Sequence, residues 1–399
     1  MELVPIQHQT YIKDLFQTAT KDISNGVVSS TTRERVRLFN QWAEWLGKYI
    51  RTVSPSLEEL QAPARIKLLA AYGAHVRNRR ISSRKHKARA QTVALAFRAI
   101  STTMQLEGQF NPLADAQNKY PKAISQLLEG YKRADPPAKP KLAIPIMVPE
   151  YIQVTYTGKS DKHDAIGDLV IIAFYYLLRV GEYTYHKPSD KRRTQQFRVK
   201  DIVLWKKQQR LNWSHSQTDL IHHCTAATLN ISNQKNGVRS QTIHQEALNS
   251  RSCPIQALIR RVKYITRYTN NPDAILGTYY VKNKQRCISA HMINAAIKTA
   301  VKGLNLHHQG ITSDLVGSHS LRAGGAMAMH LNGVGDNTIK KMGRWSTNTF
   351  LMYIHQQISA FSKGLSTKMA NKINFHNIAF QPTPGPKLFV TPGPKLIVA

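Results

Sequence analysis

The sequence predicts a mainly α protein with a small antiparallel β-sheet, organised as a helical module followed by an α+β module. Three apolar segments with helical spacing lie within residues 31–110. A proline-rich stretch at 134–150 follows, where each proline removes a backbone donor and disfavours helix in the preceding residue. Beyond it, strand-like segments at 197–204 and 226–244 lie among further helices.

The helical module is expected over residues 29–112, after an N-terminal arm at 1–28. Its helices repeat apolar residues along one face: Val36, Phe39, Trp42, Leu46 and Tyr49, then Ile66, Leu69, Gly73 and Val76, then Val93, Phe97, Ile100 and Met104. Between the second and third helix the chain is dense in cations, namely Arg77, Arg79, Arg80, Arg84, Lys85, Lys87 and Arg89. This basic connection is a predicted contact segment for a polyanionic partner.

The second module is expected over 161–375, after a Pro-rich basic linker at 113–160 that carries one short helix near 124–131. It begins with a strongly apolar helix that we expect to end at Gly181, since glycine commonly stops helices. Further helices are predicted near 254–268, 289–303, 320–332, 336–343 and 346–354. Residues 376–399 contain TPGPKL twice, which predicts a flexible tail.

The charge balance points to a polyanionic partner. The 399 residues include 56 Lys and Arg against 23 Asp and Glu, a formal net charge of +33. Such a field attracts nucleic acid, the commonest polyanion that a basic protein meets. A membrane surface is the alternative, but it favours charge on one amphipathic helix or beside an anchor, and here the charge is spread along the chain. The N-terminus also lacks the layout of a secretory signal, so we expect an intracellular protein with no membrane partner.

The cysteines and histidines do not predict a metal centre. Cys224, Cys253 and Cys287 are far apart and form no CxxC pair, so neither a disulfide framework nor a zinc site is indicated. The His222-His223 and His307-His308 pairs lack HExxH spacing and nearby cysteines. We therefore expect chemistry without a metal.

Two segments place cations beside helix ends. In LLRVGEYT an apolar helix delivers Arg179, with Glu182 three residues later. A guanidinium there needs an anion, which a bound phosphate or simply Glu182 would supply. In GSHSLRAGGA we expect Ser318 as N-cap, which puts His319 and Arg322 on one face at a helix start, where phosphate also meets backbone N–H groups. The alternative is that this His and Arg face water.

The third segment, KKMGRWSTNTFLMYIH, ends close to Tyr353. A tyrosine among Phe350, Leu351 and Met352 is by itself more often a core residue. Gly324, Gly325 and Ala326, in the second of the three segments, would let another backbone approach closely.

In this order and spacing the three segments resemble the tyrosine recombinase (phage integrase) family. Its pattern is Arg in an RxxE context, a hairpin lysine, HxxR, a His or Trp, and a nucleophilic Tyr. HSLRAGGA, GRWST and YIH are most similar to eukaryotic Crypton and DIRS-like transposon members. The resemblance covers residues 30–375 and implies a helical, SAM-like core-binding domain and a catalytic domain that together clamp duplex DNA.

The resemblance also implies roles for single residues. Arg179 and Arg322 would grip the nonbridging phosphate oxygens, because a planar guanidinium offers bidentate hydrogen bonds. His319 would assist proton transfer, and Tyr353 would be the nucleophile. Lys235, just before the Asn236-Gly237 turn of a predicted hairpin, would be the general acid.

The remaining position of the pattern is open between two neighbouring residues. Arg344 lies nine residues before Tyr353 and Trp345 eight. Trp345 is favoured for the His/Trp role because of its residue type, with Arg344 as a second phosphate contact. Glu182 would orient neighbouring groups.

The resemblance implies a site-specific recombinase or integrase that acts through a 3′-phosphotyrosyl intermediate in mobile-element integration or excision. It would need neither ATP nor metal and no cofactor, assemble as a dimer or tetramer on duplex DNA, and act in the nucleus. Two alternatives remain, a type IB topoisomerase-like enzyme and a non-catalytic domesticated DNA-binding protein.

The excess of cations predicts binding to duplex DNA that weakens steeply with salt, because each phosphate contact releases counterions. The measurement is the dissociation constant over a series of salt concentrations. A flat response would contradict the electrostatic part of this prediction.

Overall fold

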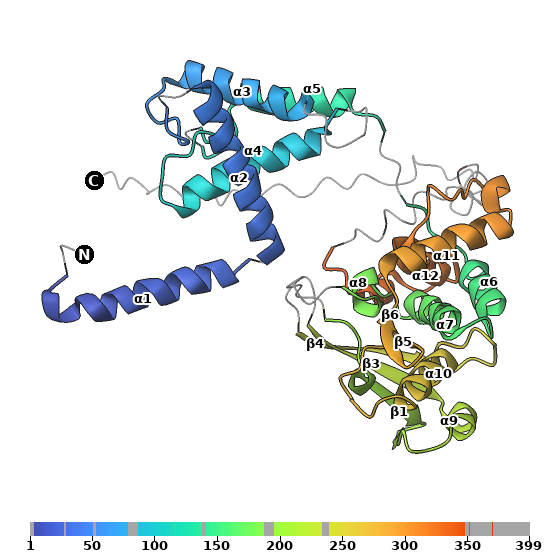
Figure 1. Ribbon diagram of the computed structural model, residues 1–399. Coiled ribbons are helices and arrows are strands. Elements are labelled where there is room, and N and C mark those ends of the chain that lie inside the picture. The colour runs from blue at the N-terminus through green and yellow to red at the C-terminus, as the bar shows by residue number, and fades with distance from the viewer. Residues whose placement is uncertain are drawn as a thin grey trace, which may run out of the picture.

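The computed structural model describes residues 4–27, 29–50, 53–78, 87–115, 117–137, 141–186, 195–233 and 239–347, together with Leu351 and Met369. These parts are mainly helical with two small antiparallel sheets, which confirms the predicted fold class. Figure 1 shows a helical module and, beside it, a module of helices packed on a sheet. Among the described helices, none is both long and apolar enough to cross a bilayer.

The first module is built from α1 (Ile6–Asn25), α2 (Ser29–Tyr49), α3 (Ala62–Asn78), α4 (Ala90–Leu106) and α5 (Lys122–Ala134). The three predicted helices are confirmed as α2, α3 and α4. Their core centres on Trp42, which is fully buried and lies 4.8 Å from the ring of Tyr72. Val36 and Tyr49 are exposed, so the apolar stripe of α2 extends beyond this core. In Figure 1 α1 leads away from the other four helices.

The stretch predicted as a linker is divided between the two modules. Ile124 and Leu128 of α5 lie in the core of the first module. Helix α6 (Met147–Tyr156), which we did not expect, packs through Val148 and Ile152 into the core of the second. Pro149 is tolerated there because it lies in the first turn, where the missing N–H has no helical acceptor.

The second module is organised around helix α7 (Asp161–Tyr175), in which every residue from 165 to 174 is buried. Around it lie α10 (Pro254–Thr266), α11 (Ala290–Gly303) and α12 (Ser318–Leu331). The predicted end of the first helix at Gly181 is wrong. Helix α7 ends at Tyr175, because Leu177 has a left-handed φ of 48°, and Gly181 lies inside the next helix, α8 (Val180–Tyr183).

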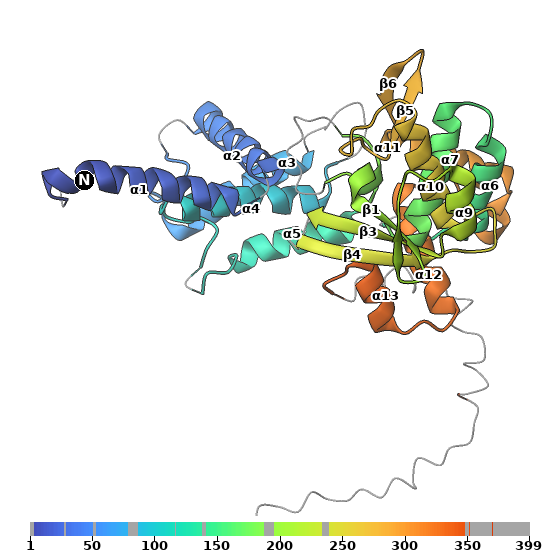
Figure 2. The same cartoon turned by 90° about the horizontal axis from the view of Figure 1, so that it is seen from below.

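The sheet has the strand order β2-β1-β3-β4. Its strands are β1 (Ile202–Lys206), β2 (Gln209–Leu211), β3 (Ala226–Asn233) and β4 (Arg239–Glu246). The predicted β3–β4 pairing is confirmed, with Leu229 opposite Ile243, while the Asn236-Gly237 turn lies outside the described residues. The strand expected at 197–204 starts later, because residues 199–201 form a 3-10 turn. In Figure 2 the β3–β4 hairpin extends toward the first module.

Five shorter elements complete the described fold: β5 (Thr278–Val281), β6 (Lys284–Cys287), α9 (Gln217–His223), a 3-10 helix (Leu306–Gln309) and α13 (Asp336–Gly343). Strands β5 and β6 form a separate antiparallel hairpin. The predicted helices at 254–268, 289–303, 320–332 and 336–343 are confirmed as α10, α11, α12 and α13. The helix expected at 346–354 lies mostly outside the described residues.

A buried ion pair closes the first module. The guanidinium of Arg77 pairs with Asp135 and donates a hydrogen bond to the carbonyl of Ala88. Asp135 also accepts the N–H of Ala90, at 2.8 Å, at the start of α4. Arg77 is only 6% exposed, so the structure corrects its expected DNA contact: it clamps the ends of α3, α4 and α5.

The substitution Asp135→Asn should lower the free energy of unfolding by about 1–2 kcal/mol, because it removes the charge of this pair. Burial raises the pKa of Asp135, but the hydrogen bonds from Arg77 and Ala90 outweigh it and hold that pKa below its usual range. The difference in the free energy of unfolding between the variant and wild type should therefore be fully present above the pKa of Asp135 in the unfolded chain, about 4. It should vanish as pH falls through the lower pKa of Asp135 in the folded protein.

Urea unfolding at several pH values measures this effect. The control is Glu34→Gln, which breaks the exposed Arg37–Glu34 pair and should cost less than about 0.5 kcal/mol. Equal losses for the two variants would contradict a structural role of the buried pair.

Candidate functional site

The turn between α7 and α8 positions the first two predicted site residues. Arg179 is the N-cap of α8, and Glu182 is the third residue of that helix. The carboxylate of Glu182 reaches back and accepts the N–H of Arg179 at 2.8 Å. The RxxE spacing is therefore a capping arrangement, in which a glutamate satisfies an N–H at the helix start.

Glu182 is shared by two guanidinium groups. Its side chain is 1% exposed and accepts two hydrogen bonds of 2.9 Å from Nη1 and Nη2 of Arg344. A longer contact of 3.3 Å joins it to Nη1 of Arg179. The paired, short bonds make Arg344 the main partner of Glu182, since bidentate charge-assisted bonds are the strongest kind.

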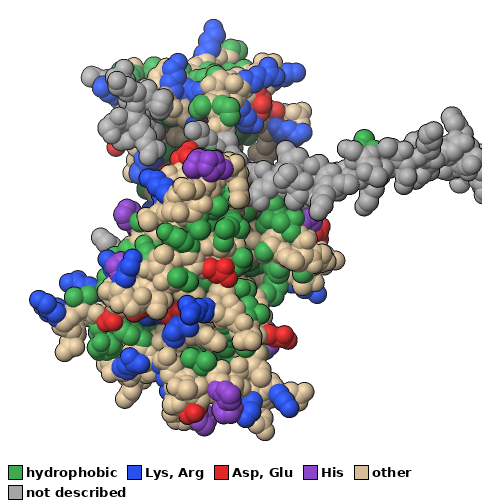
Figure 3. All heavy atoms as spheres, turned by 90° about the vertical axis from the view of Figure 1, so that its right-hand side faces the viewer, with side chains coloured by type: hydrophobic (Ala, Val, Ile, Leu, Met, Phe, Trp, Pro, Cys, Tyr) green, Lys and Arg blue, Asp and Glu red, His purple; other side chains and the backbone are tan. Residues whose placement is uncertain are grey.

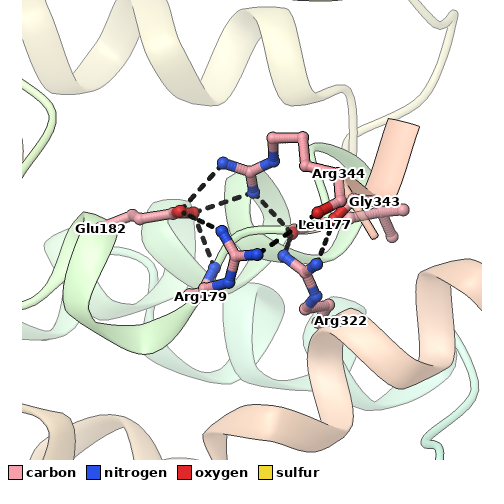
Figure 4. A network of polar contacts seen from close by, with 6 residues as sticks. All are labelled: Leu177, Arg179, Glu182, Arg322, Gly343 and Arg344. Atoms are coloured by element: carbon pink, nitrogen blue, oxygen red, sulfur yellow. Dashed lines mark hydrogen bonds and ion pairs between the residues drawn. The ribbon is translucent and has the colours of Figure 1, made fainter. Parts of the chain in front are cut away.

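Backbone carbonyls hold the third arginine and tie the group together. Nη1 of Arg322 donates to the carbonyl of Leu177 at 2.7 Å, and Nη2 of Arg344 donates to the same oxygen at 3.1 Å. Arg322 also donates to the carbonyl of Gly343, and Arg179 donates to that of Arg344 at 3.4 Å. Figure 4 shows the three guanidinium groups converging between Glu182 and these carbonyls.

His319 lies beside this group of arginines. Burial, followed by the positive charges of Arg322 and Arg179, lowers the pKa of its imidazole. A neutral imidazole has one nitrogen that donates and one that accepts, so His319 can do either at neutral pH. The N-cap of α12 is Gly317 rather than the expected Ser318, whose N–H donates to the side chain of Asn294 at 2.6 Å.

Trp345 covers Arg322. The guanidinium carbon lies 4.3 Å from the centre of the indole ring, a cation–π contact. A side chain at Gly343 could not coexist with this ring, because a Cβ there would lie 1.5 Å from it. Two residues are candidates for the His/Trp position. Trp345 stacks on the site residue Arg322, whereas Arg344 is buried against Glu182.

A pocket of about 440 Å³ opens next to Arg344 and Trp345. It is lined by Gln241, Asn337, Lys340, Lys341, Arg344, Trp345 and Ser346. The described residues that line it include cations and amides but no carboxylate, so the pocket suits an anion. Elsewhere among the described residues, no three His, Cys, Asp or Glu side chains gather as a metal site would require.

The other predicted site residues divide into two groups. Lys87 and Arg89 are exposed just before α4, as DNA contact requires. Lys235, Tyr353, Arg79, Arg80, Arg84 and Lys85 lie outside the described residues. The structure thus brings together Arg179, Glu182, His319, Arg322, Arg344 and Trp345.

Sequence reasoning missed the carbonyls of Leu177 and Gly343. A left-handed leucine has no signature in sequence, because leucine rarely adopts that conformation. Gly343 before an arginine at the end of a helix was a usable signal, since a glycine there admits a large neighbour such as Trp345.

Removing either partner of the buried Glu182–Arg344 pair should be costly, because it leaves the other charge uncompensated. We expect Glu182→Gln and Arg344→Met each to lower the free energy of unfolding by about 3 kcal/mol. The double variant should lose clearly less than the sum of the two, which urea unfolding measures as a coupling energy. The Asp273→Asn variant, which breaks an exposed pair with Arg198, is the control and should unfold much like wild type.

Comparisons with known proteins give similarities of fold only. No family model and no curated protein matches the sequence. Among solved structures, the chain is similar to the Tn1549 transposon integrase in complex with transposon right end DNA, at 13% identity over 88% of this chain and 98% of that one, with a TM-score of 0.46.

Two further structures show similarities of the same kind. The XerH site-specific recombinase bound to a palindromic difH substrate is 13% identical over 82% of this chain and 76% of that one, with a TM-score of 0.48. The XerA recombinase is 14% identical over 89% and 96%, with a TM-score of 0.34. At this identity and these TM-scores, the activity of the chain has to be inferred from its own residues.

Proposed function

We propose that this chain is a site-specific DNA recombinase of the tyrosine recombinase class, which cuts and rejoins DNA strands through a covalent link to Tyr353. The observation that supports this most is that Arg179, His319 and Arg322 come together in one group, in which Arg179 contacts the buried Glu182 and backbone carbonyls hold Arg322. These residues come from two distant segments, and both segments belong to the motif pattern of that class.

The charges of the site suit a phosphodiester. The guanidinium groups of Arg344 and Arg179 share the carboxylate of Glu182, and backbone carbonyls hold that of Arg322, which leaves a surplus of positive charge among residues that are mostly buried. Such fixed charge stabilises a pentacoordinate phosphate without rearranging at the moment of reaction. The side chain of Arg179 is 27% exposed, whereas that of Arg344 is 1% exposed. Arg179 would therefore make the first contact with a phosphate oxygen.

In the proposed reaction the phenolic oxygen of Tyr353 attacks the phosphorus, and the bond from phosphorus to the 5′ oxygen breaks. The products are a 3′-phosphotyrosyl link and a 5′ hydroxyl, whose proton comes from Lys235. His319, held neutral by its surroundings, would accept the phenolic proton or bind a phosphate oxygen. Attack by another 5′ hydroxyl reverses these steps and joins a new strand. The roles of Tyr353 and Lys235 rest on the motif order alone.

The proposed substrate is duplex DNA. The net charge of +33 favours a polyanion. On the face in Figure 3 the described Lys and Arg side chains are scattered and form no concentrated basic patch that would bind phosphate as the arginine group would. We further propose that the chain serves mobile-element integration or excision in the nucleus and assembles into a dimer or tetramer on DNA. In this proposal it is most similar to the recombinases of Crypton and DIRS-like elements.

Covalent trapping tests the proposal. The probe is a duplex of randomised sequence that carries a 5′-bridging phosphorothiolate, whose thiol leaving group cannot rejoin the strand. Wild type should form a covalent adduct that maps to Tyr353, and Tyr353→Phe should form none. Arg179→Ala should slow adduct formation by about 100-fold or more at saturating DNA, because it removes a charge that stabilises the transition state.

The control is Arg37→Gln, which removes the same charge from an exposed position of the first module and should leave the rate unchanged. An adduct on another residue would overturn the assigned nucleophile. Tight DNA binding without any adduct would favour a non-catalytic protein. Plasmid relaxation without joining between molecules would favour the topoisomerase alternative.

A further inference from the structure

The connection between the two modules ends as a strap on helix α12. The strap, residues 141–146, runs along the helix that carries His319 and Arg322. The N–H of Leu142 donates to the carbonyl of Leu315 at 2.8 Å, and that of Ile144 donates to the carbonyl of Ser320 at 3.4 Å. Pro145 favours an extended conformation in the residue before it, which suits a segment that pairs along its edge.

The strap is buried on both sides. Ala143 is 3% exposed and packs with Ala323, Ala326 and Ile339, in a small cluster that joins α12 to α13. Ile144 is 1% exposed and packs on the other side, in the main core of the second module. The strap is therefore part of the packing around α12 and not a tether on the surface.

Two glycines hold α12 between the strap and the end of α7. A Cβ at Gly324 would lie 2.1 Å from the carbonyl oxygen of Ile144, and one at Gly325 would lie 2.4 Å from that of Phe174. Both distances are shorter than any real contact, so only glycine allows this approach. A Cβ at Gly325 would also lie 2.5 Å from the side chain of Leu177, the residue whose carbonyl accepts a hydrogen bond from Arg322. A shift of the strap thus presses on the helix that carries Arg322.

The other end of the connection is fixed to the first module. Asp135 is held by Arg77 and by the N–H of Ala90, as described above. Only the five residues 136–140 separate it from Lys141, and three of these are proline. Six chain steps span at most about 20 Å. Movement of the first module beyond that length must pull on the strap.

We propose that the strap couples engagement of DNA by the first module to the position of His319 and Arg322. The inference rests on the proposed function, since it describes how that site is regulated. When the first module is fixed on a duplex, the short tether would hold the strap in the contacts with Leu315 and α12 described above. A site whose catalytic groups take their final position only on bound DNA would be protected from reacting without it.

The test is an insertion that loosens the tether and leaves both of its anchors intact. About eight Gly and Ser residues are added after Lys139, which adds slack without altering the strap or the Arg77–Asp135 pair. The control carries the same insertion after Gly108, an exposed turn of the first module. Gly324→Ala is the second variant, because its methyl group displaces the strap without changing the tether.

Two readouts are taken on the full-length chain with the phosphorothiolate duplex. The first is the rate of adduct formation at saturating DNA, where weaker binding no longer counts. It should fall at least about tenfold for the Lys139 insertion and for Gly324→Ala, and not for the control, because small misplacements of catalytic groups are costly. The second is amide hydrogen exchange, in which DNA should protect the strap and the first turns of α12 in wild type and in the control only.

Unchanged protection and an unchanged rate in the Lys139 insertion would overturn the coupling while leaving the proposed function intact. Absence of an adduct in wild type would overturn the proposed function, and the exchange measurement would still decide the coupling. Equal loss in the Gly108 control would also overturn it, because insertion anywhere would then have the same effect.

Discussion

A carboxylate buried between two guanidinium groups holds the candidate site in place. A buried Glu182 would be very costly unless its charge were matched, and the bidentate contact with Arg344 supplies that match. The contact also joins α8 to the end of α13, two elements that are far apart in the chain. Arg344 makes the two short hydrogen bonds to the carboxylate of Glu182, so the guanidinium of Arg179 stays partly exposed. The backbone N–H of Arg179 donates to the same carboxylate, which fixes the position of that residue.

The second constraint is the close packing of backbone around α12. Arg322 is held by two carbonyl groups, so its place depends on the path of the backbone at Leu177 and Gly343 more than on any side chain. That path depends in turn on Gly324 and Gly325, which bring α12 against the strap and the end of α7. The segment linking the modules is in this way part of the support of the site.

Local patterns in the sequence were sufficient for most helices, because periodic apolar residues set which face is buried. They were also sufficient for the β3–β4 pairing, which the Asn236-Gly237 turn between strand-like segments predicts. They were misleading where tertiary contacts prevail. Helix α6 forms despite Pro149, and α7 stops before Gly181 because Leu177 turns its carbonyl toward two arginines. Arg77 resembled its basic neighbours in sequence, but a partner 58 residues away takes it into the core.

The sequence by itself determined the net charge of +33, which predicts a polyanionic partner, the order of the two sets of helices and the identity of the residues with suitable chemistry. Charge, periodicity and motif spacing are properties of short segments, so they can be read from the sequence alone. Only the tertiary structure decided which cations meet, since Glu182 and Arg344 are 162 residues apart and nothing local pairs them. The physical reason is that a buried charge accepts only a partner that the whole fold can bring within hydrogen-bond distance.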